Sequence, residues 1–161
     1  MKTFNQLPDH SRIWIYQSNK ELSIEEVAKI KAAANDFISQ WTSHGNSMDA
    51  AVEVMHARFV IVAVDEQTAP ASGCGIDKSF RFIQDIEKQF NISLLNRMQV
   101  AYKAGDAIFT CSLNEFEELI AANKITENTL VFNNLVDSKA GLTSNWEVPL
   151  KESWHKRMSS K

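Results

Sequence analysis

A wholly apolar run of six residues, Phe59–Val64, leads into a polar segment that contains two glycines. A run of this length without a polar residue predicts a strand that is buried on both faces. The segment that follows, Ser72-Gly73-Cys74-Gly75-Ile76-Asp77-Lys78-Ser79, predicts a turn and then a helix with Asp77 as its N-cap. The chain is therefore expected to combine sheet and helix.

Periodic patterns on either side predict the other elements. Ser23-Ile24-Glu25-Glu26 is a capping box, and the apolar spacing after it predicts a helix that ends at His44-Gly45. The second helix is expected to run from Asp77 to Asn91. Gly105-Asp106 predicts a tight hairpin. The strands expected are residues 12–17, 51–56, 59–64, 98–103 and 107–111.

This order, β-α-β-β-α-β with the last strand doubled, predicts an α+β fold of the ferredoxin-like split βαβ type. Both helices would lie on one face of an antiparallel or mixed sheet, with residues 12–17 and 59–64 as its central strands. Residues 1–161 are expected to form one domain, with a core at about 11–112. The other sheet face needs a cover, which is either a C-terminal helix-strand extension at about 113–161 or a second copy in a homodimer.

Composition narrows the function classes. The chain has 161 residues and a net charge of −3, so it lacks the basic surface that favours nucleic acid as a partner. Two cysteines are too few for a disulfide framework, and no long apolar stretch predicts a signal peptide or a membrane span. We expect a cytoplasmic protein without membrane insertion.

The turn before the second helix is the candidate site. Backbone N–H groups beside the positive end of a helix favour an anion, so we expect a small anionic ligand there, with added charge from Lys78. Asp77 argues against the anion unless its side chain turns back to cap the helix. The expected ligand-binding residues are Ser72, Gly73, Cys74, Gly75, Asp77, Lys78 and Ser79.

Cys74 offers an alternative from another class. The helix dipole and Lys78 would favour its thiolate, so Cys74 can serve as the nucleophile of a hydrolase or transferase, with His44 as the first base to test. The plainer interpretation makes Cys74 a small buried residue in a tight turn. A third hypothesis is a protein–protein interaction module that uses the uncovered sheet face.

Carboxylates of Asp65, Glu66 and Asp77 can also converge on a divalent cation. Capping by Asp77 and solvation of Asp65 and Glu66 explain the same residues without a metal. We therefore expect no metal site and no cofactor.

Several motifs along the chain point to a family resemblance. They are Ser11-Arg12-Ile13-Trp14-Ile15-Tyr16-Gln17-Ser18, Trp41 with His44-Gly45, Ala63-Val64-Asp65-Glu66, Ser72-Gly73-Cys74, Ile76-Asp77-Lys78-Ser79, Val131-Phe132-Asn133-Asn134-Leu135-Val136 and Trp146-Glu147-Val148-Pro149. In these motifs the chain resembles a family of small bacterial proteins that are often labelled "ABC transporter ATPase" but carry no nucleotide-binding motifs. The resemblance implies no activity, and a P-loop would need glycines where Ser72 and Asp77 stand.

Overall fold

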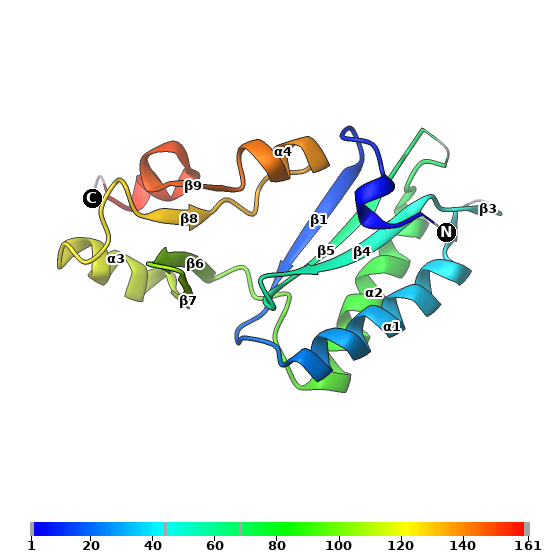
Figure 1. The fold of residues 1–161 in the computed structure, drawn as a ribbon, viewed down its shortest axis with the longest axis horizontal. Coiled ribbons are helices and arrows are strands. Elements are labelled where there is room, and N and C mark those ends of the chain that lie inside the picture. Colours follow the sequence, from blue (N-terminus) through cyan, green and yellow to red (C-terminus); the bar gives the residue numbers. More distant parts are fainter. Residues whose placement is uncertain (1, 44, 68, 160–161) are drawn as a thin grey trace. The chain divides into compact units, whose positions relative to one another are not determined.

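The computed structural model describes residues 2–43, 45–67 and 69–159. The chain divides into two compact units (Figure 1). The first unit comprises the residues up to Leu95 together with Asp137–Ala140, and the second comprises Asn96–Val136 together with the residues from Gly141 onward. Each unit contains an antiparallel sheet and helices, which confirms the α+β class.

The sheet of the first unit has the strand order β1-β5-β4. Its strands are β1 (Arg12–Gln17), β4 (Ala50–Met55) and β5 (Phe59–Val64), and both pairings are antiparallel. All six residues of β5 are fully buried, as the apolar run predicted. The prediction that residues 12–17 form a central strand is wrong, because among the described residues β1 pairs only with β5 and, through a single bridge from Arg12, with Ser138.

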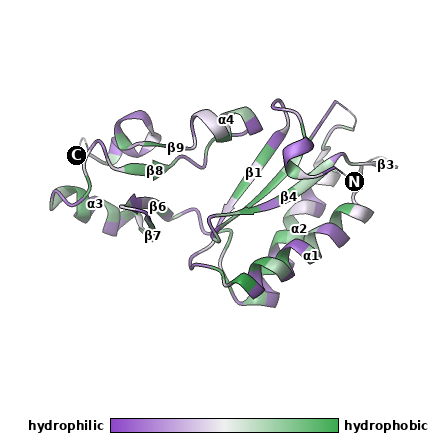
Figure 2. Cartoon of the chain, in the orientation of Figure 1, coloured by the Kyte–Doolittle hydropathy of each residue, from purple (hydrophilic) through white to green (hydrophobic). Residues whose placement is uncertain are grey.

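Two long helices, α1 (Ile24–Gln40) and α2 (Gly73–Phe90), cover the same face of this sheet (Figure 1). Alternate residues of β5 point toward them. Polar and apolar residues alternate along both helices (Figure 2), as expected of helices that pack on one side only. Their shared core contains Ile30, Ala34, Ile38, Val60, Val62, Val64, Phe82, Ile83 and Ile86.

The helix starts are set by serine caps. Ser23 Oγ accepts from Glu26 N at 3.0 Å, and Glu26 Oε1 accepts from Ser23 N at 2.9 Å, so the first capping box is confirmed. The helix ends at Gln40, earlier than predicted, and Gly45 lies at φ 81° in the turn between β2 (Thr42–Ser43) and β3 (Asn46–Ser47).

The start of α2 also differs from the prediction. Ser72, and not Asp77, is its N-cap: Ser72 Oγ accepts from Gly75 N at 3.3 Å. Because Ser72 already has the extended backbone of a capping residue, the two glycines after it fall inside the first helical turn instead of in a loop. The helix ends at Phe90, and its C-cap Asn91 has the left-handed backbone expected of a stop.

The sheet of the second unit has the order β7-β6-β8-β9. The strands are β6 (Gln99–Ala104), β7 (Ala107–Ser112), β8 (Leu130–Phe132) and β9 (Glu147–Pro149). The hairpin turn is confirmed, with Gly105 at φ 63°. The ferredoxin-like prediction needed this hairpin in the first sheet, and that part is wrong: the free edge of β6 pairs with β8, through Tyr102 and Val131.

The core of the second unit is partly aromatic. Helix α3 (Leu113–Ala121) is capped by Ser112 and buries Phe116 completely. Trp146 is buried with its ring 5.1 Å from that of Phe132. Two 3₁₀ helices, η2 (Leu150–Glu152) and η3 (Trp154–Met158), follow β9. No described helix is long and apolar enough to cross a membrane.

A segment far along the chain, Asp137–Ala140, belongs to the first unit and contacts its N-terminal residues. The 3₁₀ helix η1 (Phe4–Gln6) precedes β1, and the start of α4 (Lys139–Ser144) lies against it. Lys139 Nζ donates to Leu7 O at 2.6 Å and to Asn5 O at 3.1 Å. Ile13 N also donates to Asp137 O at 3.0 Å, so residues late in the chain complete the N-terminal part of the first unit.

Candidate functional site

The first turn of α2 is held against the end of α1. Trp41, which caps α1, is buried, and its indole Nε1 donates to Gly75 O at 3.0 Å. Lys78 Nζ donates to Thr42 O at 3.3 Å, so β2 also lies beside α2. These two contacts bring Gly73, Cys74 and Gly75 to a defined place at the start of the helix.

The structure does not gather all the predicted ligand-binding groups at this turn. The Ser79 hydroxyl is buried and donates to Ile76 O at 2.8 Å, so it points into the helix. Asp77 lies on the exposed side and pairs with Arg81, one turn further on, at 2.7 Å. Lys78 is exposed, but it lies toward the cleft between α1 and α2.

Cys74 is exposed in the first turn of α2, which excludes the interpretation that it is a buried turn residue. His44, its predicted base, lies outside the described residues. Cys111, in contrast, is buried, and burial raises the pKa of its thiol to about 11, with a smaller effect from Glu115. The two cysteines are therefore in very different surroundings.

A hydrogen-bonded pair that the sequence did not predict lies where β5 ends. Asp65 accepts from Gln67 N at 3.0 Å and contacts His10 Nε2 at 3.1 Å. The Gln67 N–H group, followed by His10, lowers the pKa of the Asp65 carboxyl. The antiparallel register, with Arg12 opposite Val64, explains the pair, because it brings the residues before β1 to those after β5.

The carboxylates considered as ligands of a cation instead accept hydrogen bonds from protein groups or form ion pairs with them. Glu66 Oε2 accepts from Ala71 N at 3.1 Å, and Glu66 Oε1 lies 3.6 Å from the Arg12 guanidinium. Within the described ranges, no three histidine, cysteine, aspartate or glutamate side chains gather as a metal site would require.

The cleft between α1 and α2 has about 360 Å³ of space. Phe37 and Phe82 stack in its wall, with ring centroids 4.6 Å apart and planes 7° apart, and Phe37 also contacts Trp41 at 5.0 Å. Lys78 and Arg81 are i, i+3 neighbours on α2, so their side chains share one side of that helix. The lining residues are Phe37, Gln40, Trp41, Lys78, Arg81, Phe82 and Asp85.

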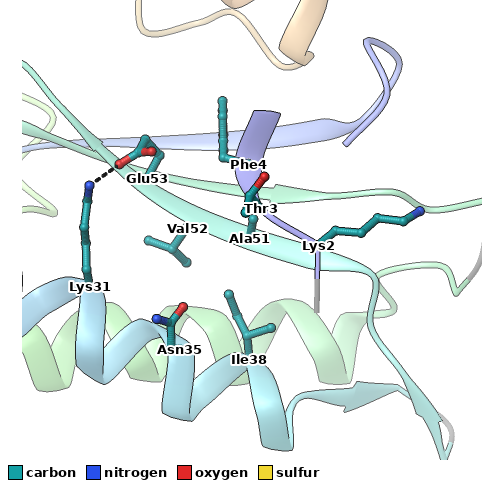
Figure 3. Close-up of a pocket in the computed structure, with 9 residues that line it drawn as sticks. All are labelled: Lys2, Thr3, Phe4, Lys31, Asn35, Ile38, Ala51, Val52 and Glu53. Carbon is teal, nitrogen blue, oxygen red and sulfur yellow. Dashed lines mark ion pairs between the residues drawn. The ribbon is translucent and has the colours of Figure 1, made fainter. Parts of the chain in front are cut away.

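A second hollow, of about 400 Å³, lies along β4 (Figure 3). Helix α1 forms one wall and the residues at η1 form the other. Lys31 pairs with Glu53 at 2.8 Å, and Lys2 pairs with Asp49 at 2.8 Å. The lining residues are Lys2, Thr3, Phe4, Lys31, Asn35, Ile38, Ala51, Val52 and Glu53.

The chain was also compared with known proteins. Neither models of protein families, nor curated proteins, nor solved structures give a match. Function is therefore inferred from the residues of the first unit and their geometry.

Proposed function

We propose that the protein binds a small anionic ligand with a planar apolar part in the cleft between α1 and α2. The observation that carries the proposal is that two cations, Lys78 and Arg81, border a cleft whose wall is a stacked pair of aromatic rings. A planar group would lie against Phe37, and its anionic group would lie between the two cations. This retains Lys78 from the sequence prediction but moves the ligand along α2.

The present partners of the two cations support this assignment. Lys78 donates to an uncharged carbonyl at 3.3 Å, which is a weaker partner than a carboxylate or phosphate would be. Arg81 pairs with Asp77 on the exposed surface, where an ion pair contributes little and can be exchanged. Asp85 and Asp77 offset part of the positive charge, so we expect affinity to depend on both cations.

The test is an NMR titration with benzoate, followed through backbone amide shifts, with neutral benzamide as the control ligand. Benzoate should shift amides of α1 and α2 near Phe37 and Lys78. Lys78→Ala should weaken benzoate binding about tenfold, because a hydrogen bond to a charged group is worth about 1.5–3 kcal/mol.

The matched control is Lys29→Ala, which removes an exposed lysine of α1 that pairs with Glu25 and does not line the cleft. Binding by this variant should equal that of the unaltered chain. Equal affinity for benzoate and benzamide, or unchanged benzoate binding in Lys78→Ala, would refute the proposal.

A cysteine-dependent hydrolase or transferase is the second candidate. The observation that favours it is that Cys74 is exposed in the first turn of α2, where unpaired backbone N–H groups favour negative charge. Alkylation by iodoacetamide should then be faster at Cys74 than at a cysteine in an unfolded peptide at pH 7. A rate equal to that of the peptide would remove this candidate.

A further inference from the structure

Strand β4 is an edge strand whose outward main-chain groups can be identified from the pairing. Asp65 N donates to Asp49 O at 2.8 Å, and the register then continues Ala51 to Ala63 and Glu53 to Ile61. Bonded pairs alternate along an antiparallel ladder, so the residues between them direct their N–H and C=O groups away from β5. These residues are Ala50, Val52 and Val54.

One of these outward groups is already satisfied by the side chain of Glu53. Glu53 Oε1 accepts from Val54 N at 2.9 Å and from Lys31 Nζ at 2.8 Å. Figure 3 shows the Lys31–Glu53 ion pair between α1 and β4. Charged side chains that cover an edge in this way prevent uncontrolled strand pairing. Val54 N–H and Lys31 thus form a two-donor site for a carboxylate, and Glu53 occupies it.

The hollow beside Val52 has the shape and chemistry of a short peptide site. Asn35 and Thr3 supply polar side chains on its two walls, while Phe4, Ile38 and Ala51 supply buried apolar surface. Its volume of about 400 Å³ suits a few residues of extended chain. The described residues provide no hydrogen-bond partner for the outward N–H and C=O of Val52.

We propose that this groove binds the C-terminal end of an extended peptide, whose carboxylate replaces that of Glu53 at Val54 N–H and Lys31. The peptide adds to the edge parallel to β4, because its carboxyl end must lie near Val54. The N–H and C=O of Val52 pair with its main chain, as in other cases of strand addition. Charge complementarity determines the occupant: with Glu53 displaced, Lys31 needs a new anion. Glu53 therefore acts as an internal competitor that limits binding.

The experiment measures binding of the N-acetylated tetrapeptide Thr-Val-Thr-Val, as the free acid and as the C-terminal amide, by NMR titration of the full chain. The free acid should shift the amides of Val52 and Val54. Glu53→Ala should bind the acid about tenfold more tightly than the unaltered chain, and the amide should gain little. Glu25→Ala is the matched control, because it removes a glutamate whose lysine partner lies on the same helix as Lys31.

Lys31→Ala in the Glu53→Ala background should abolish the preference for the acid, whereas Lys29→Ala should keep it. Equal affinity for acid and amide would overturn carboxylate recognition. Absence of shifts at Val52 and Val54 in all variants would overturn the groove as a peptide site. If Glu53→Ala forms dimers in sedimentation and binds no peptide, the edge pairs with a second copy of the chain and the proposal is wrong.

Discussion

The two units bury their sheets by different means. In the first unit, β5 is wholly buried by aliphatic and aromatic side chains, two long helices cover one face, and ion pairs such as Lys31–Glu53 are partly exposed. In the second unit, two of the four strands have only three residues, and the core encloses a histidine. Between pH 7 and pH 4, the stability of the first unit should therefore depend mainly on packing volume, and that of the second also on protonation of this histidine.

The buried histidine is His155, in η3. It is 1% exposed, its Nδ1 lies 2.6 Å from Ser153 Oγ, and its ring stacks on Trp154 with centroids 3.9 Å apart. Phe116 lies on another side, at 5.6 Å. Burial lowers the pKa of His155 from its ordinary value of 6.5 to about 4. The neutral imidazole ring is thus part of the core, and its protonation would place a charge there and destabilise the packing.

The largest effect should come from cavities, one made in each unit. Phe116→Ala should lower the free energy of unfolding by about 3–5 kcal/mol and Ile83→Ala by about 2–5 kcal/mol, since both side chains are fully buried. Hydrogen exchange should show faster exchange in α3, β6 and β8 for the first variant and in α1, α2 and β5 for the second. If either variant accelerated amide exchange equally in both units, the two units would unfold in a single cooperative transition.

The next largest effect should come from acid, which should lower the stability of the second unit more than that of the first. His155 takes up a proton at about pH 6.5 when unfolded but only at about 4 when folded, so its contribution is complete above pH 6.5 and is lost as the pH falls toward 4. The loss should reach about 3 kcal/mol in the second unit, at 1.36 kcal/mol for each pH unit between the two values.

Urea unfolding of the unaltered chain and of His155→Gln at several values between pH 7 and pH 4 measures this effect. It is the difference between the two proteins in the slope of the unfolding free energy against pH. His10→Gln is the control, because His10 is exposed and its ring is not enclosed in a core. If His155→Gln had the same slope as the unaltered chain, protonation of His155 would not account for any loss of stability in acid.

The smallest effect compares the two helix caps. Ser23→Ala in the first unit and Ser112→Ala in the second each remove a side-chain acceptor from the helix start, at 3.0 and 3.1 Å, and should each cost about 1 kcal/mol. Because α3 has nine residues and α1 has 17, the fraying that follows should reach further along α3, as circular dichroism and amide exchange would show. Equal fraying would mean that packing, not capping, holds both starts.

Local signals in the sequence predicted much of this fold. The strand Phe59–Val64, the cap at Ser23 and the turn at Gly105 are each decided by a few adjacent residues, and all three are confirmed. The partner of the hairpin was not predictable, because alternation shows which face of a strand is buried but not which strand lies beside it. Ser72 and Asp77 both suit an N-cap, and only the structure distinguishes them.

The candidate site was harder to predict for the same reason. Lys78 was identified because it is charged and close to a helix start, whereas Arg81 and Phe37 join it only through the packing of α2 on α1. The His10–Asp65 pair can be predicted only when the register of β1 on β5 is known. The hydrogen bond from Val54 N to Glu53 can be interpreted only when β4 is known to be an edge strand. Relations between elements therefore define the site, and single motifs do not.

The hydrogen bonds from Lys139 to Leu7 and Asn5 affect the order of events during synthesis. Leu7 and Lys139 are 132 positions apart, so at about 5–20 residues per second the ribosome adds the lysine roughly 7–26 s after the leucine. Until then, the carbonyl groups of the N-terminal segment lack their lysine partner, and β1 lacks its bridge to Ser138. The first unit therefore begins to form early on the ribosome, but the nascent chain can complete it only after Ser138 and Lys139 have been added.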